Sequence, residues 1–171
     1  MVTQLSTIMT NHTASPSVHT PVGQWGGRVR VVTDAFEINA AGSTGVDADG
    51  DYFTLCRLPS NSRILQFWVA GDDLDSGSNI ALDYGVYETD GTIVDEDCFA
   101  SAVNHQGAVA PTDIRFEAAA VNIETWYKEL WEVAGASSDP GGQYDIVATN
   151  TAATSGLQAG TLAFMIMYTV D

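Results

Sequence analysis

Short runs of alternating apolar and polar residues recur along the chain, separated by turns rich in glycine, proline and aspartate. Alternation with a period of two is typical of half-buried β-strands, and many of these runs are β-branched or aromatic. Within 63–70, the alternation places the even-numbered residues on one face and the odd-numbered residues on the other. The strands that we expect are 28–33 with an extension over 35–38, 52–58, 63–70, 80–88, 114–118, 143–149 and 160–170.

One segment has helical periodicity instead. Its apolar residues recur at helical spacing over 122–134 and form a wide stripe. Asn122 is suited to the N-cap, and Gly135 is suited to the C′ position that ends a helix. Between the expected strands, we interpret 94–103 as a short helical or irregular crossing and 104–111 as a loop.

These elements predict a mainly β protein with an antiparallel β-sandwich or jelly-roll-like fold. The α-helix at about 122–134 would cover an open end or an edge of the sandwich. Residues 1–24 lack periodicity and are rich in Thr, Ser, His and Pro, so we expect an extended N-terminal arm. Residues 25–171 are expected to form a single domain, because a chain of this length can bury one core without a disulfide or metal.

Charge narrows the possible partners. The 171 residues carry 22 acidic side chains against six Lys and Arg, a formal net charge of −16. Such a field repels nucleic-acid backbones and anionic membranes, so we expect neither as a partner. The hydrophobic fraction of 45% separates the chain from disordered acidic sequences.

The charges are also unevenly placed. The acids concentrate in expected loops at 47–51, 72–75 and 95–97. Four of the six basic residues fall in or beside the first strands, namely Arg28, Arg30, Arg57 and Arg63. We therefore expect an acidic face and a less acidic side near the arm, and we expect the partner to bind the latter.

No segment has the features of a targeting signal. No basic side chain precedes Arg28, and residues 1–10 contain no apolar run of signal-peptide length. No stretch approaches the ~20 apolar residues of a membrane-spanning helix. Export by the general route is not expected, and Cys56 and Cys98 are expected to stay reduced.

The most metal-like stretch contains Asp47, Asp49 and Asp51, whose carboxylates alternate as they do in some calcium loops. The calcium-loop template fails, because its sixth position is Tyr52 rather than Gly and its twelfth is Leu58 rather than Glu. We favour a solvated acidic turn, and we expect no metal or other cofactor. A cation site would need two acidic loops to meet at one end of the sandwich.

No catalytic constellation is visible. His12 and His19 lie in the expected arm and His105 lies in a loop, and none belongs to a metal-ligand motif. The nucleophile, phosphate-binding and dinucleotide-binding motifs are absent from the sequence. We therefore do not expect an enzyme.

Candidate partner-binding residues lie where the arm meets the domain. Trp25 is flanked by glycines, and we expect it to anchor contacts between subunits because Trp is enriched at interface cores. Val18 and Val22 would add apolar contacts, and Arg28 and Arg30 would add charged ones. The arm would order on a neighbouring subunit, and a frayed terminus is the alternative.

The other tryptophans lie in expected elements. Trp68 is expected in the core, because it is in the middle of a strand. Trp126 and Trp131 are five residues apart on the expected helix and cannot face the same way. One of them would be buried and the other would face a partner.

Three blocks of the sequence resemble small structural proteins of tailed bacteriophages. The blocks are residues 58–65 (LPSNSRIL), 83–102 (DYGVY, then DG, VD and FASA) and 159–171 (AGTL, then YTVD). In order, they are similar to a strand–turn–strand unit, to the block that follows it and to the closing strand of those proteins. The resemblance covers roughly 28–171 and omits 1–24 and 122–134.

The resemblance implies a head decoration (cement) protein with a β-sandwich fold, located on the virion surface and assembled in the host cytoplasm. The partners it implies are the major capsid protein and neighbouring copies of the chain, as a homo-oligomer that is a trimer or a dimer. The alternative is a virion fibre or tail-associated carbohydrate-binding β-sandwich module. Such a module would use exposed aromatic side chains and an acidic cation site.

Overall fold

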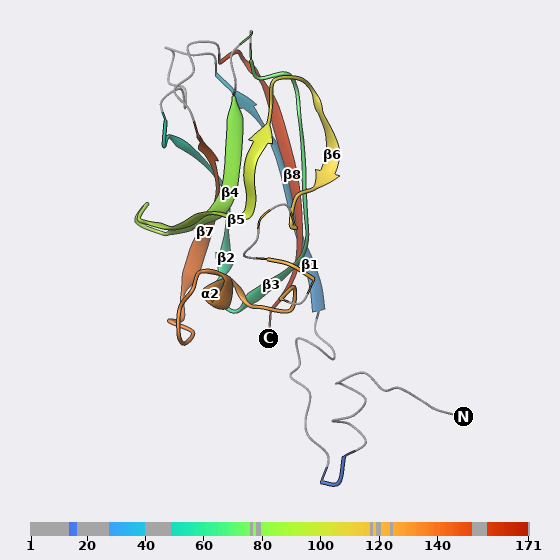
Figure 1. The fold of residues 1–171 in the computed structure, drawn as a ribbon, viewed down its shortest axis with the longest axis vertical. Helices are drawn as coiled ribbons and strands as arrows, with labels where there is room; N and C mark the ends of the chain where they lie inside the picture. The colour runs from blue at the N-terminus through green and yellow to red at the C-terminus, as the bar shows by residue number, and fades with distance from the viewer. Residues whose placement is uncertain are drawn as a thin grey trace, which may run out of the picture.

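Two four-stranded antiparallel sheets form the protein in the computed structural model, which describes residues 14–16, 28–39, 49–75, 77, 80–116, 118, 121–123, 125–151 and 157–170. The strand order is β1-β8-β3-β6 in one sheet and β2-β7-β4-β5 in the other. Figure 1 shows the two layers, with the short helix α2 at one end. The elements are β1 (Arg28–Ile38), β2 (Tyr52–Pro59), β3 (Ser62–Gly71), β4 (Ala81–Glu88), β5 (Ile93–Asn104), β6 (Val109–Asp113), α2 (Leu130–Val133), β7 (Gln143–Asn150) and β8 (Gly160–Val170).

The prediction of a mainly β protein with antiparallel strands is confirmed. Six predicted strands are present within one or two residues of their expected bounds, as β1, β2, β3, β4, β7 and β8. β8 lies at the centre of its sheet and pairs with both β1 and β3. Its even-numbered residues from Leu162 to Ile166 are buried and the odd-numbered ones between them are partly exposed, as alternation requires.

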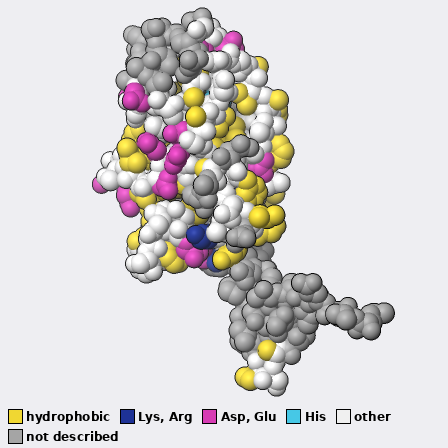
Figure 2. Space-filling model, viewed as in Figure 1, with side chains coloured by type: hydrophobic (Ala, Val, Ile, Leu, Met, Phe, Trp, Pro, Cys, Tyr) yellow, Lys and Arg dark blue, Asp and Glu magenta, His cyan; other side chains and the backbone are white. Residues whose placement is uncertain are grey.

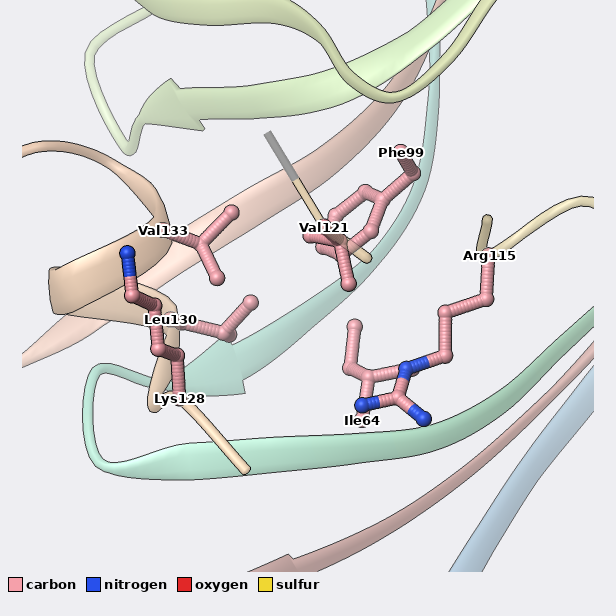
Figure 3. Close-up of a pocket in the computed structure, with 7 residues that line it drawn as sticks. All are labelled: Ile64, Phe99, Arg115, Val121, Lys128, Leu130 and Val133. Atoms are coloured by element: carbon pink, nitrogen blue, oxygen red, sulfur yellow. The ribbon is translucent and has the colours of Figure 1, made fainter. Parts of the chain in front are cut away.

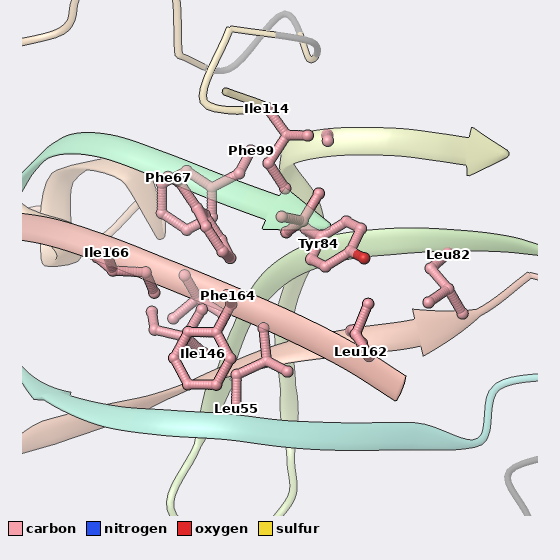
Figure 4. Close-up of a cluster of buried hydrophobic side chains, with 14 of the residues drawn as sticks. Leu55, Phe67, Leu82, Tyr84, Phe99, Ile114, Ile146, Leu162, Phe164 and Ile166 are labelled. Carbon is pink, nitrogen blue, oxygen red and sulfur yellow. The ribbon is translucent and has the colours of Figure 1, made fainter. Parts of the chain in front are cut away.

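The core lies between the sheets (Figure 4). Its centre is aromatic, because Phe67 of β3 makes edge-on contacts with Tyr84 of β4 and Phe99 of β5, each at 5.7 Å between ring centroids. Such edge-to-face pairs add to the hydrophobic contribution of the buried rings. The Tyr84 hydroxyl lies 3.0 Å from Nε2 of His105, so the buried phenol has a polar partner. These contacts join the two sheets.

The middle of the chain differs from expectation. Residues 94–103, expected to be helical or irregular, belong to β5, and β6 lies just before the strand expected at 114–118. The register of β5 against β4 shifts three times, and these shifts interrupt the alternation that marks a strand. Gly85 permits the backbone of β5 to lie close to β4, because a Cβ at this position would overlap the backbone of Asp95 and Glu96. The acidic residues 95–97 therefore lie in a strand and not in a loop.

The helix expected over 122–134 is wrong for most of its length, because only α2 is α-helical there. A longer helix would use the carbonyls of Trp126 and Tyr127 to accept amides four residues later. Instead, the side chains of Arg115 and Arg63 donate to those two carbonyls, respectively. No helix in the described part of the chain is long and apolar enough to cross a membrane.

A bulge in β3 corrects the expected faces of that strand. Its register against β8 shifts between Ile64 and Gln66. Ile64 and Phe67 are therefore both buried in the core, although strict alternation would put them on opposite faces. Leu65 is exposed, and Trp68 is half-buried rather than a core residue.

Candidate partner-binding surface

Several large apolar side chains between β6 and α2 are exposed, and so is one on β3. Ile123 is 77% exposed and Trp126 is 53% exposed, and Phe116, Tyr127 and Leu65 of β3 are also exposed. We call these five residues the loop patch. Soluble proteins rarely expose several large apolar side chains together unless the surface binds a partner.

Arg115 ties this segment to β3. It is only 3% exposed, and its Nη1 donates to the carbonyl of Leu65 at 3.1 Å while its Nη2 donates to the carbonyl of Trp126. Its guanidinium also lies 4.8 Å from the ring centroid of Phe116. Burial lowers the pKa of Arg115 to about 10, so the side chain stays charged at neutral pH. These contacts place Leu65, Phe116 and Trp126 on one contiguous surface.

Arg63 of β3 holds the next residue of the same segment. Its Nε donates to the carbonyl of Tyr127 at 2.7 Å, and its Nη2 forms an ion pair with Oε1 of Glu129 at 2.5 Å. Both side chains of the pair are largely buried. Buried arginines therefore hold the main-chain carbonyls of Trp126 and Tyr127, while the rings of these two residues are exposed. A patch fixed in this way loses little conformational entropy on binding.

A small hollow lies beside the loop patch (Figure 3). Figure 3 shows apolar side chains from β3, β5 and α2 around it, with Arg115 and Lys128 also in its lining. Its empty volume of about 190 Å³ includes open solvent. Small-molecule sites usually measure roughly 300–1,000 Å³. The loop patch is therefore better suited to a protein surface than to a small ligand.

Only some of the partner-binding residues predicted from the sequence are among the residues that the structure describes. Val18, Val22 and Trp25 lie outside the described residues. Arg28 and Arg30 are exposed at the start of β1. Their neighbour Val29 pairs with Thr169 of β8, and Thr169 pairs in turn with Arg63 of β3. Only β8 therefore lies between the start of β1 and Arg63, the residue that holds Tyr127 of the loop patch.

Sequence reasoning missed most of the loop patch. Of the two tryptophans on the expected helix, Trp126 is exposed and Trp131 is partly buried and packs against the core; that Trp126 faces a partner stays a prediction. The apolar stripe expected over 122–134 includes Ile123 and Tyr127, and both of these side chains are exposed. The signal that could have identified them is the density of large apolar residues in a segment flanked by polar turns.

Acidic side chains are unevenly distributed over the face that Figure 2 shows. Figure 2 shows them gathered towards β4 and β5, with apolar side chains on the side of β6 and β8. Burial raises the pKa of Asp83, Asp95 and Glu96, and repulsion from neighbouring acids raises each of them further. The expected separation of an acidic face from a less acidic side near the arm stays a prediction, because most of residues 1–24 lie outside the described residues and β1 itself carries Asp34 and Glu37 beside Arg28 and Arg30.

The candidate metal residues do not form a site in the described part of the chain, where no group of three or more His, Cys, Asp or Glu side chains could hold a metal ion. Asp47 lies outside the described residues. In the second acidic stretch, Asp72 accepts the Thr161 amide at 3.0 Å, and Asp75 accepts the Gly77 amide at 2.9 Å. These carboxylates satisfy backbone amides in turns.

Other reactive side chains are buried. His105 is fully buried, and burial lowers its pKa to about 4, while His12 and His19 lie outside the described residues. Cys56 and Cys98 are free thiols, in agreement with the expectation that they do not pair. Burial raises the pKa of Cys56 to about 12. Of the described groups, His105 and Cys98 are buried and Cys56 is partly buried.

Comparisons with known proteins show the fold. No family model matches the sequence, and no curated protein sequence matches it. A chain of the cyanophage Pam1 capsid asymmetric unit is similar in structure with a TM-score of 0.52 and 14% identity, over 90% of this chain and 93% of that one. A chain of the capsid of Ralstonia phage GP4 is similar with a TM-score of 0.55 and 18% identity, over 83% and 85%. The protein therefore has the same fold as chains found in two phage capsid structures.

Proposed function

We propose that this protein is a virion structural protein that decorates the outside of a phage head and reinforces contacts between capsomers. The observation that carries the proposal is the shared fold with chains of two phage capsid structures over most of this chain. The order β1-β8-β3-β6 facing β2-β7-β4-β5 supports an eight-stranded jelly roll. We assign no catalytic role and no cofactor.

The loop patch is the surface we assign to the capsid shell. It is apolar, and it is held by two buried arginines, Arg63 and Arg115. Many copies on one head would multiply a modest interface through avidity. Residues 1–24 are proposed as an arm beside the single domain of 25–171. Val18 and Val22 in the arm and Trp25 where the arm meets the domain would add contacts to a neighbouring subunit. The protein would assemble in the host cytoplasm and stay on the virion.

A binding assay with undecorated heads tests the proposal. Purified protein is mixed with heads that lack it, and the bound copies are counted after the heads are pelleted. We expect saturable, stoichiometric binding, and a Trp126→Ser, Tyr127→Ser double variant should bind at least about tenfold more weakly. Ile93→Ser is the matched control, because Ile93 is 55% exposed on the other sheet. Absence of binding by the unaltered protein would overturn the proposal.

A second candidate is a fibre or tail-associated carbohydrate-binding module. The exposed rings of Trp126 and Tyr127 favour it, since such rings stack on sugars. A glycan array separates the two candidates. A signal that is lost in the Trp126→Ser, Tyr127→Ser variant, with no binding to heads, would favour the second.

A further inference from the structure

The outer edge of β1 differs from the three other sheet edges. The four edge strands of the described sheets are β1, β6, β2 and β5. Natural edges are usually shielded from pairing by short length, proline, bulges or charge. β6 has five residues and contains Pro111, and β2 has a bulge and ends at Pro59. β5 shifts its register three times and carries the acidic residues 95–97.

β1 lacks the short length, the proline and the bulges that protect the other edges, although it carries charged side chains. It has eleven residues without proline, glycine or lysine, and its register against β8 continues from Arg28 to Ile38 without a shift. In the described part of the chain, no strand pairs with its other side. The amide of Ala35 donates to the Asp34 carboxylate at 2.8 Å, which indicates that the odd-numbered amides of β1 point away from β8.

The charges along β1 are self-complementary. Arg28 and Arg30 lie in its first half, and Asp34 and Glu37 lie in its second half. An antiparallel partner with the same sequence would place the basic half of each strand beside the acidic half of the other.

The geometry of antiparallel pairing limits the register. Opposite residues share a face, so around a two-fold axis each residue must be opposite one of the same parity. A register centred on Val32 places Arg30 opposite Asp34 on both sides of the axis. A register centred on Val31 places Arg28 opposite Asp34 in the same way. Both registers form two ion pairs across the axis.

We propose that β1 pairs with β1 of a second copy in antiparallel orientation, which joins two four-stranded sheets into one continuous sheet around a two-fold axis. A second copy is the occupant that the charge pattern fits, because two chains of net charge −16 repel each other elsewhere. The interface is isologous, as a closed dimer requires. The inference deepens the self-association contained in the proposed function, and its test needs no phage heads.

A charge swap tests the pairing. The full-length protein is studied by sedimentation velocity over a wide range of concentrations. Asp34→Arg should raise the dimer dissociation constant about tenfold or more, because each of two attractive pairs becomes repulsive. Combining it with Arg30→Glu should restore dimerisation for the Val32-centred register, and combining it with Arg28→Glu should do so for the Val31-centred register.

Two control variants make the result specific. Glu88→Arg changes the charge by the same amount as Asp34→Arg at an exposed position outside β1, and it should leave the dimer unchanged. Circular dichroism checks that every variant is folded. A chain that sediments as a monomer throughout overturns the inference, as does a dimer that neither Asp34→Arg nor the swaps affect. A monomer that still binds heads would refute this inference and leave the proposed function intact.

Discussion

Arg115 is predicted to be the residue on which the structure of the loop patch depends most. Arg115→Leu keeps an apolar stem but removes the two hydrogen bonds to the carbonyls of Leu65 and Trp126. Hydrogen bonds from a charged donor contribute about 1.5–3 kcal/mol each, and the leucine avoids burying a charge. We therefore expect a net loss of about 3 kcal/mol in the free energy of unfolding. For a domain of this size, that loss lowers Tm by roughly 6–12 °C.

Thermal unfolding and hydrogen exchange together measure this effect. Exchange in peptides that cover Trp126 and Tyr127 should accelerate at least about tenfold, because their carbonyls lose the groups that fix them. Arg57→Leu is the control, since Arg57 lies on β2 with a half-exposed side chain, and its Tm should fall less. A Tm within about 2 °C of the unaltered protein, with unchanged exchange, would refute the role assigned to Arg115.

Three further predictions follow from buried groups. Gly85→Ala should destabilise the protein by about 2 kcal/mol or more, because its methyl group would overlap the Asp95 backbone; an unchanged Tm would contradict the close packing of β4 and β5. The pKa of His105 falls from 6.5 to about 4 on folding, so the unfolded chain binds more protons between these pH values and stability should decline as pH falls through them. Urea titrations should show a shallower decline in His105→Gln, and an identical decline would contradict this assignment. Burial raises the pKa of Cys98 well above its ordinary value, so iodoacetamide should label this buried thiol only after unfolding, whereas the partly buried Cys56 thiol, whose pKa burial raises to about 12, should react slowly in the native protein; rapid labelling of Cys98 in the native protein would contradict its burial.

The strands that could be predicted from sequence are those with an uninterrupted alternation. β8 is the best example, because its buried and partly exposed residues follow the period of two along most of its length. β5 could not be predicted in the same way, since its register shifts interrupt the alternation. Gly85 lies at one of these shifts and leaves room for the backbone of β5, and a glycine inside a strand pattern is a recognised signal for such irregularity.

The prediction of a helix over 122–134 was wrong for a different reason. The apolar spacing and the capping residues near Asn122 favour a helix locally, and Gly135, with a φ of +77°, does follow α2 as predicted. Arg63 donates to a carbonyl 64 residues further along the chain, so the competing interaction is not visible in a local window. Tertiary hydrogen bonds therefore override helix propensity here. The exposure of Trp126 and Tyr127 is a consequence of the same contacts.

Of the predicted partner residues, the described part of the chain places only Arg28 and Arg30, which are both exposed on β1. The expected polarisation of charge stays a prediction, because Asp34 and Glu37 follow Arg28 and Arg30 on the same strand. The roles of Val18, Val22 and Trp25 stay predictions.

Binding to undecorated phage heads is the most direct test of the account. The account predicts saturable binding at a fixed number of copies per head. It also predicts that decorated heads rupture at a higher temperature than undecorated heads and withstand a larger salt stress. It also predicts that the Trp126→Ser, Tyr127→Ser variant loses most of this binding while Ile93→Ser retains it. Failure of the folded, unaltered protein to bind heads at any concentration would contradict the account.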